Sequence, residues 1–372
     1  MNSIVYSYKT QSDDDPSQIV EYLLNKMGGL SQRVSSGDRV LIKPNLVAPF
    51  RKATTDLKFI DVLIKKIRQV GATPVIGESS GFEFDTDITF QILGVKQFAR
   101  DRNVELINFE DAQYKKIQLD NGLGWVEITT AAFEARLIIN LAVLKEHTLT
   151  EISGAVKNLI GFLSKPSRRY LHCHRLEDGI TALGRKFKGV LHLLDARNPL
   201  NRSVFGESRA LGVCLAGLNA FALDHFGSKL IGIDPESVKY LRGTDAYDVE
   251  GPVPDQLPHS SDKHFLRKGL HRMLYRTLYY LDDMKHNTLG GKSVIPAAHW
   301  HFGLHPALGS VTPEELHHLS LVCPVGAINR DKKKIIKEKC INVRCLRCYH
   351  DPATNKVLVK GFNLSNVRLR NG

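Results

Sequence analysis

The sequence of 372 residues predicts an α/β fold with a mostly parallel sheet flanked by helices, followed by a small C-terminal α+β module. Strand and helix signals alternate through the first 110 residues, which is typical of right-handed crossovers between parallel strands. At roughly 150 residues per domain, the length allows more than one domain. We expect a large domain over 1–250, a helical linker over 251–300 and the module over 301–372.

Each predicted element rests on a local pattern. Residues 57–69 carry apolar side chains at 59, 60, 63, 64 and 67, which is the spacing of one helical face. Gly71 ends that helix, and a second helix is expected over 88–99. Short apolar runs bounded by polar turns are typical of strands buried on both faces. These runs are residues 40–42, 73–76, 104–107, 136–144 and 189–194.

A basic amphipathic helix is expected over 263–286, after the proline-rich break GPVPDQLPH. Its predicted apolar side consists of Phe265, Leu266, Leu270, Leu274, Leu278 and Leu281. Such a helix suits a protein partner or a membrane surface, but packing of this side on its own domain is the simpler interpretation.

The positive charge is concentrated at the C-terminal end. The chain has 51 Lys and Arg against 39 Asp and Glu, a net charge of +12, and residues 330–372 alone hold twelve basic and three acidic residues. A basic end attracts polyanions or an acidic protein partner. This segment offers only Tyr349 and Phe362 for stacking on bases, which argues against nucleic acid.

No pattern in the sequence indicates a membrane or secreted protein. The longest apolar runs, 141–144 and 213–218, are far shorter than the roughly 18 residues that span a bilayer. The first residues lack a basic stretch followed by an apolar one, as a secretory signal would have. We therefore expect a cytoplasmic protein.

The cysteines predict a metal site. Four of the six lie within 26 residues, which favours metal binding over disulfides in an intracellular chain: Cys323, Cys340, Cys345 and Cys348. The phrase CPVGAI, a short basic hairpin and the second cysteine group together resemble a bacterial two-cluster ferredoxin. Three cysteines of that pattern are replaced here by Pro313, Leu316 and Leu319, and all three would serve one cluster. The resemblance therefore implies a single [4Fe–4S] cluster on the four that remain.

Two departures leave an alternative open. Four residues separate Cys340 from Cys345 where the ferredoxin pattern has two, and no Cys-Pro pair follows Cys348. Zinc also binds four thiolates in paired spacings, so a zinc site is the alternative. If the cluster is present, its negative charge accounts for the surrounding Lys and Arg. These would also dock an acidic electron donor such as ferredoxin or flavodoxin.

Polar side chains follow several predicted strands, where core packing does not require them. Taken singly, each is expected at the surface or in a cap, but ligand sites of parallel sheets gather at the C-terminal ends of strands. We therefore expect one polar pocket, in which Lys groups facing carboxylates tune a Lys or His for proton transfer. The expected catalytic residues are Lys43, Glu78, Lys145, His147, Lys157 and Asp195. The expected substrate-binding residues are Asn45, Asn158, Arg169 and Asp224.

The same phrases match a family. KPNL, the GES turn, LKEHT, SGAVKNLIG, LLDA and ALDHFGSKLIGIDPESVKYL resemble the domain-of-unknown-function family 362 over about residues 35–245. Some members of that family carry ferredoxin-type clusters. The resemblance therefore implies iron–sulfur association and redox work, without naming a substrate.

These observations favour an iron–sulfur reductase that passes electrons from an external donor through one cluster to a small organic substrate. The carboxylate or phosphate of that substrate would be held by Lys43, Lys145, Lys157 and Arg169. Either His147 or Lys157 would supply the protons. The alternatives are a non-catalytic electron carrier or binding protein with a structural four-cysteine site, and a basic nucleic-acid-associated protein.

Two histidine groups leave a second metal site open, because imidazole is a common ligand. They are His299, His301 and His305 in HWHFGLH, and His172 and His174 in LHCH. Between the two remaining cysteines, Cys173 is a better candidate for a reactive thiol than Cys214.

Overall fold

The structure is a computed structural model. It describes residues 3–11, 14–82, 84–119, 122–201, 203–204, 206–256, 273–274, 276–285, 305–340, 348, 357–361 and 364–367. None of the helices in these ranges is long and apolar enough to cross a membrane.

Nine strands of the described chain form the central sheet, in the order β11-β1-β10-β9-β7-β2-β3-β4, with β8 paired to β7. Their bounds are β1 Ser3–Lys9, β2 Arg39–Lys43, β3 Thr73–Glu78, β4 Glu105–Asn108, β7 Leu137–His147, β8 Glu151–Ser153, β9 Leu191–Leu200, β10 Val213–Gly217 and β11 Tyr247–Glu250. Strands β9, β7, β2, β3 and β4 run parallel, whereas β10 is antiparallel to both of its neighbours. The predicted α/β class with a mostly parallel sheet is confirmed, and the five predicted apolar runs correspond to β2, β3, β4, β7 and β9.

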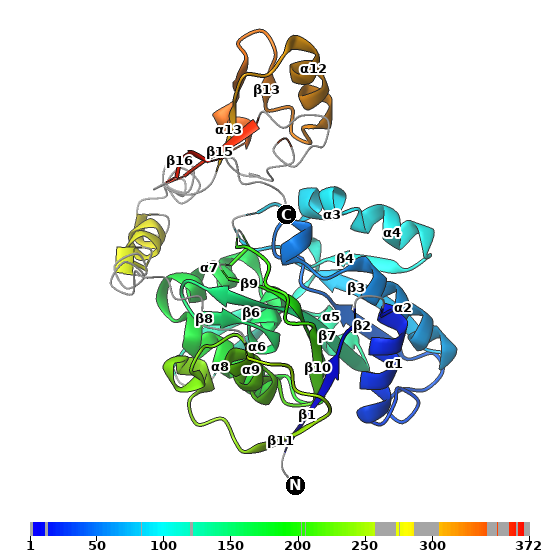
Figure 1. Cartoon of the computed structure of the whole chain (residues 1–372). Helices are drawn as coiled ribbons and strands as arrows, with labels where there is room; N and C mark the ends of the chain where they lie inside the picture. The colour runs from blue at the N-terminus through cyan, green and yellow to red at the C-terminus, as the bar shows by residue number, and fades with distance from the viewer. Residues whose placement is uncertain are drawn as a thin grey trace.

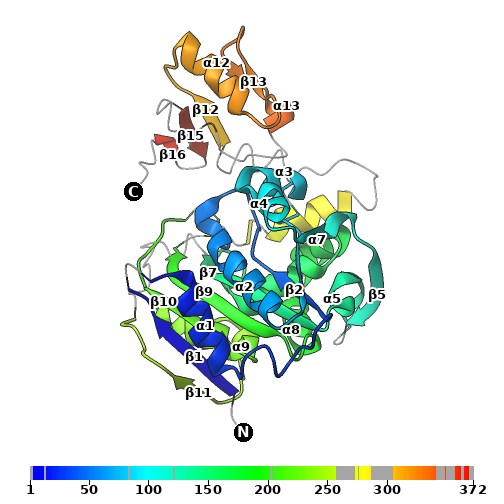
Figure 2. The same ribbon diagram turned by 90° about the vertical axis from the view of Figure 1, so that its right-hand side faces the viewer.

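Helices cover both faces of this sheet (Figures 1 and 2). On one face lie α1 (Pro16–Lys26) and α2 (Leu57–Gln69), and on the other lie α6 (Ala155–Asn158), α8 (Leu176–Lys186) and α9 (Ala220–Leu230). Successive side chains of a strand point to opposite faces. Ile42 therefore joins the core under α1 and α2, while Leu41 joins the core under α8 and α9.

The helix predicted over 57–69 is confirmed as α2, but the one predicted over 88–99 is two helices. They are α3 (Thr86–Leu93) and α4 (Val95–Asp101), separated by Gly94. Gly94 has φ +79°, a left-handed conformation that ends a helix and that glycine adopts without steric cost.

Smaller elements complete the large domain. They are the hairpin β5 (Tyr114–Leu119) and β6 (Gly124–Thr129), the helices α5 (Ala131–Glu134) and α7 (Lys165–His174), and the 3₁₀ turns Arg51–Ala53, Phe109–Asp111, Leu159–Phe162, Pro235–Ser237 and Lys239–Leu241.

The predicted helix over 263–286 is described only at 273–274 and 276–285, and both stretches are helical. The prediction of its apolar side was wrong for Leu274 and Leu281, which are 55% and 56% exposed. The buried side instead carries Tyr279, Asp282 and Asp283. The two carboxylates pair with cationic side chains of α7, and these ion pairs determine which side of the helix faces the domain.

The described part of the C-terminal module combines a three-stranded antiparallel sheet, two helices and a small hairpin. The sheet contains β12 (His305–Leu308), β15 (Val357–Gly361) and β16 (Leu364–Val367), and the helices are α12 (Pro313–Val322) and α13 (Lys337–Cys340). A capping box formed by Thr312 and Glu315 begins α12. The hairpin of β13 (Ile328–Asn329) and β14 (Lys334–Ile335) lies where the sequence predicts a basic hairpin.

Candidate functional site

The C-terminal ends of adjacent parallel strands carry most of the predicted polar residues. Lys43 ends β2, Glu78 ends β3, and Lys145 lies near the end of β7, which neighbours β2. Asp195 on β9 is in register with Val143 of β7. These strand ends point toward the end of the molecule at which the C-terminal module lies (Figures 1 and 2). The structure therefore brings these side chains together at the C-terminal edge of the parallel strands, called the C-terminal edge below.

A buried charge network occupies one part of this edge. The Nζ of Lys43 forms an ion pair with Oε2 of Glu78, and the two side chains are 0% and 3% exposed. Next to them lies Arg168 of α7, which donates to Ser79 and, at 2.7 Å, to Oε1 of Glu110. Burial lowers the pKa of Lys43 and raises the pKa of Glu78, while their mutual attraction opposes both shifts.

Gly161 allows this pair to form. A Cβ at Gly161 would lie 2.8 Å from Nζ of Lys43 and 3.0 Å from Oε2 of Glu78. Only glycine leaves this space, so the ion pair lies directly against the backbone of the loop after α6. Since both side chains are enclosed, the pair joins the ends of β2 and β3 and does not present its charge to solvent.

Lys145 lies in a second part of the C-terminal edge, where its hydrogen-bond partners are uncharged. Its Nζ donates to Oδ1 of Asn45 at 2.6 Å and to the carbonyl oxygen of Ala53 at 2.7 Å. Asn45 then donates from Nδ2 to Oδ1 of Asn158, at 2.7 Å. Burial and, to a smaller extent, the positive charge of Lys157 lower the pKa of Lys145 to about 7, while the carboxylates of Glu78 and Asp195 oppose this shift.

The chain of amides continues into the sheet. Asn158 donates to Oδ1 of Asn140 at 2.7 Å, and Nδ2 of Asn140 donates to the carbonyl oxygen of Ala155 at 2.8 Å. The same nitrogen lies 2.9 Å from Nδ1 of His192, which must therefore accept the hydrogen bond. Burial lowers the pKa of His192 to about 3, consistent with a neutral ring protonated on Nε2.

Asp224, predicted to bind substrate, holds the backbone of α6 instead. Its Oδ1 accepts from the N–H of Ala155 at 2.5 Å, and its Oδ2 accepts from Val156 and from the hydroxyl of Tyr240, both at 3.1 Å. A Cβ at Gly154 would lie 2.2 Å from Oδ1. Asp224 thus positions the helix that carries Lys157 and Asn158, and burial raises its pKa to about 7.

Asp195 and Arg169 are each bound to charged partners within the chain. Asp195 accepts from Nε and Nη2 of Arg197, at 3.0 and 2.8 Å. Arg169 forms ion pairs with Asp282 and Asp283 on the helix over 276–285. Its guanidinium, expected to hold a substrate anion, is therefore occupied by two carboxylates of this protein.

His147 ends β7 and is partly exposed. Its Nδ1 lies 3.2 Å from the backbone N–H of Leu149 and 3.4 Å from that of Thr150. A ring nitrogen that accepts from N–H groups carries no proton, so the proton of the neutral imidazole is on Nε2.

Sequence reasoning missed three residues of this edge: Arg168, Asn140 and His192. Asn140 and His192 are single polar residues inside the apolar runs LIINLAVL and VLHLL. A polar side chain inside a buried strand needs a buried partner, and that pattern was available in the sequence. Arg168 directly precedes the predicted Arg169, and only the orientation of α7 distinguishes the two.

Three of the four predicted metal ligands are in described parts of the module, and Cys345 lies outside them. Cys323 and Cys348 pack in the same apolar cluster, together with Leu316 and Leu319. Cys323 Sγ accepts from the backbone N–H of Ala327 at 3.2 Å, and Cys340 is buried. Among the described residues, no three or more His, Cys, Asp or Glu side chains lie close enough to hold a metal ion.

The histidine groups are only partly described. His299 and His301 lie outside the described residues, as does the side chain of His305. His174 pairs with Asp283 at 2.5 Å, and Nδ1 of His172 lies 2.8 Å from the carbonyl oxygen of Arg168. Cys173 and Cys214 are both buried, and burial raises the pKa of each thiol, to about 12 for Cys173. Neither thiol therefore has the lowered pKa of a reactive cysteine.

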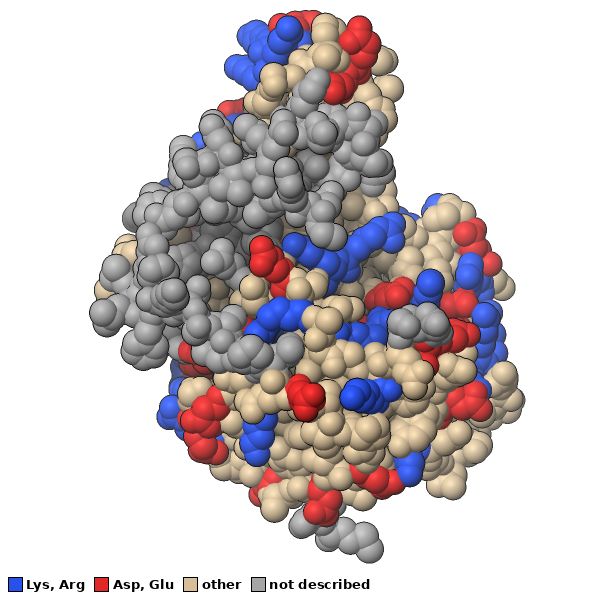
Figure 3. All heavy atoms as spheres, viewed as in Figure 1, with Lys and Arg blue, Asp and Glu red and all other residues tan. Residues whose placement is uncertain are grey.

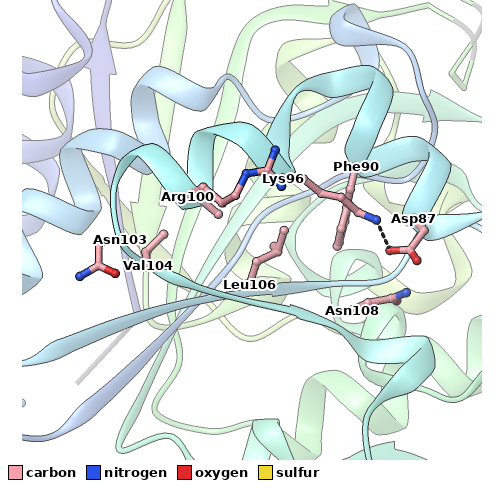
Figure 4. A pocket seen from close by; sticks show the side chains of 9 residues that line it. Asp87, Phe90, Lys96, Arg100, Asn103, Val104, Leu106 and Asn108 are labelled. Carbon is pink, nitrogen blue, oxygen red and sulfur yellow. Dashed lines mark ion pairs between the residues drawn. The ribbon is translucent and has the colours of Figure 1, made fainter.

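A shallow pocket lies over the edge strand β4, between that strand and helices α3 and α4 (Figure 4). Its lining includes Lys96, which pairs with Asp87 at 2.8 Å, and Arg100 and Asn108. None of the predicted site residues lines it. Because the buried Lys, Glu and Asn groups lie elsewhere, we place the candidate site at the strand ends.

Comparisons with known proteins give a family, one similar sequence and one solved structure. The model of the family named domain of unknown function 362 matches residues 40–229. A thylakoid-associated protein of Synechocystis sp. is 24% identical over 227 residues, covering 58% of this chain and 70% of that protein. The lactate racemase apoprotein of Thermoanaerobacterium thermosaccharolyticum is 17% identical with a TM-score of 0.40. That match covers 62% of this chain and 57% of the other, less than two thirds of its length.

Proposed function

Because the chain belongs to the domain of unknown function 362 family, whose description assigns no activity, we propose a function from its own residues: an iron–sulfur oxidoreductase. It passes electrons from an external donor through one [4Fe–4S] cluster to a small organic substrate that carries a carboxylate or phosphate. The observation that supports this best is the packing of Cys323 and Cys348 in one apolar cluster, in the same module as buried Cys340.

The thiolates of Cys323, Cys340, Cys345 and Cys348 would hold the cluster. When bound, the cluster supplies one-electron transfer. The backbone N–H of Ala327 donates a hydrogen bond to Cys323 Sγ. Hydrogen bonds of this kind, from N–H groups to ligand sulfur atoms, tune the reduction potential of iron–sulfur clusters.

The substrate would bind at the C-terminal ends of the strands. Lys43 and Arg169 are engaged by carboxylates of this protein, so we assign binding of the anionic group to Lys157, with Lys145 and Asn45 beside it. Either the ammonium group of Lys157 or His147, at the end of the same strand as Lys145, would supply the protons, His147 only when its ring is doubly protonated. Asp224, Asn158 and Asn140 would position these groups without contacting substrate.

Metal content tests the proposal. We expect protein purified without oxygen to contain about four iron and four sulfide per chain, and to give an EPR signal after dithionite. Cys323→Ser and Cys345→Ser should lose most of the iron because each removes one ligand. Cys214→Ser, which removes a buried thiol of the large domain, should retain it.

Other results would identify the alternatives. One zinc per chain without sulfide would overturn electron transfer and leave a structural four-cysteine site. A full cluster that is reduced but never oxidised by small carbonyl, carboxylate or phosphate compounds would support a non-catalytic electron carrier.

The basic hairpin of the module is the proposed docking site for an acidic electron donor. Arg330, Lys332, Lys333 and Lys334 are all exposed on or next to the turn between β13 and β14. Figure 3 shows Lys and Arg side chains both at the far tip of the module and in the upper part of the large domain. Clustered charge of one sign raises the association rate with an oppositely charged partner.

We therefore expect the double change Lys332→Glu and Lys333→Glu to slow reduction by ferredoxin or flavodoxin about ten-fold at low salt, with little effect at high salt. Stopped-flow reduction at several ionic strengths measures this. The matched control is Lys115→Glu with Lys116→Glu, which makes the same charge change on exposed residues of β5. Equal slowing by both double variants would refute docking at the hairpin.

A further inference from the structure

Lys145 has an unusual environment for a buried lysine. It is 3% exposed, and its two hydrogen-bond acceptors, Oδ1 of Asn45 and the carbonyl oxygen of Ala53, are both uncharged. An ammonium group has three N–H donors, whereas a neutral amine has two donors and one lone pair. The two acceptors therefore match the neutral amine, whose lone pair occupies the remaining direction.

The nearby carboxylates belong to other cations. Glu78 is paired with Lys43, Asp195 with Arg197 at 2.8 Å, and Glu146 with Arg209 at 2.9 Å. Each of these carboxylates already has a cationic partner, so Glu78 and Asp195 offset only part of the cost of burying a second charge at Lys145.

A second lysine, Lys157, acts electrostatically on Lys145. Lys157 lies on α6, next to Asn158, and the amide of Asn158 binds the same Asn45 that accepts from Lys145. The charge of Lys157 acts directly on Lys145 and disfavours its protonation, whereas Glu78 and Asp195 favour it. A lysine desolvated beside another cation is an activated nucleophile toward carbonyl carbon.

We propose that Lys145 is a covalent attachment point for a small carbonyl compound bearing a carboxylate, such as a 2-oxo acid, which it binds as an imine. The amine lone pair attacks the carbonyl carbon, and the proton that the nitrogen then gives up moves to the carbonyl oxygen. Loss of water from the resulting carbinolamine then forms the C=N bond, so no electrons are gained or lost overall. The ammonium of Lys157 pairs with the carboxylate of the ligand.

This proposal does not depend on the cluster, and its test uses no electron donor of the protein. The full-length chain is incubated with glyoxylate and sodium cyanoborohydride, whose hydride converts an imine to a stable carboxymethyl-lysine that peptide mass spectrometry locates. At pH 7 about half of Lys145 is neutral, against fewer than about one in a thousand of ordinary lysines. We therefore expect labelling at Lys145 well before any other lysine, with a midpoint near pH 7.

Two variants make the test specific. Lys145→Arg should abolish the fast labelling, because a guanidinium does not form this imine. Lys157→Gln should move the pH midpoint upward by about one pH unit, since it removes the neighbouring positive charge. Circular dichroism establishes that both variants are folded. Labelling spread over surface lysines, or labelling of Lys145 only after unfolding in urea, would overturn the proposal.

Discussion

Glu78→Gln should lower the free energy of unfolding by about 3–5 kcal/mol, because it leaves the ammonium of Lys43 buried without a counter-charge. Lys43 is 0% exposed, and its other acceptor, the carbonyl oxygen of Pro44, is distant at 3.4 Å. Arg168 lies close enough to act on both groups, so loss of the carboxylate also leaves two cations facing each other. Urea denaturation of the full chain measures the effect.

Two controls separate the buried pair from a general loss of charge. Glu105→Gln breaks an ion pair with Arg39 whose side chains are 50% and 42% exposed, and it should cost less than about 1 kcal/mol. Replacing both Lys43 and Glu78 by Met should be less destabilising than Glu78→Gln alone, since no unpaired charge remains. A double variant whose cost equals the sum of its single variants would contradict this account.

The fold was largely predictable because its signals are local. A buried parallel strand is a short apolar run, and the five runs in the sequence became β2, β3, β4, β7 and β9. The apolar positions of residues 57–69 repeat at the helical period, and the helix has those bounds. Strand β10 (Val213–Gly217) was missed although it lies within the apolar run 213–218, because that run was compared only with the length of a membrane span.

The partners within the site were not predictable, because they depend on contacts between distant parts of the chain. Arg169 and Asp282 are 113 residues apart, and only the docking of the helix over 276–285 on α7 brings them together. For the same reason Asp224 was expected to bind substrate. Asp224 accepts a hydrogen bond from Ala155, which lies 69 residues earlier in the chain at the start of α6. The contact also requires Gly154, because a Cβ at that position would collide with the carboxylate of Asp224. The sequence indicated which side chains gather at the strand ends, but not which of them form hydrogen bonds or ion pairs with one another.

Two buried groups, Asp224 and His192, make the free energy of unfolding depend on pH in opposite directions. The pKa of Asp224 rises from an ordinary 3.8 to about 7. Between these values the unfolded chain has released a proton that the folded chain keeps, so Asp224 makes stability fall as pH rises. The pKa of His192 falls from an ordinary 6.5 to about 3. Here the unfolded chain binds the extra proton, so His192 makes stability rise with pH over almost the same range.

Each contribution amounts to about 4–5 kcal/mol across its full range, at roughly 1.4 kcal/mol per pH unit. In the unmodified chain the two nearly cancel between about pH 4 and pH 6.5. Removing one should therefore expose the other. Relative to the unmodified chain, Asp224→Asn should gain roughly 2–3 kcal/mol as pH rises from about 4.5 to about 6.5, and His192→Asn should lose a similar amount.

Urea denaturation at several pH values measures these slopes. The slope is the informative quantity, because each substitution also removes hydrogen bonds and shifts stability at every pH. Asp248→Asn, which removes a carboxylate from an exposed position on β11, should follow the unmodified chain. If Asp224→Asn instead followed the unmodified chain, Asp224 would be ionised in the folded protein at these pH values. The start of α6, and with it the placement of Lys157, would then be held by a buried negative charge.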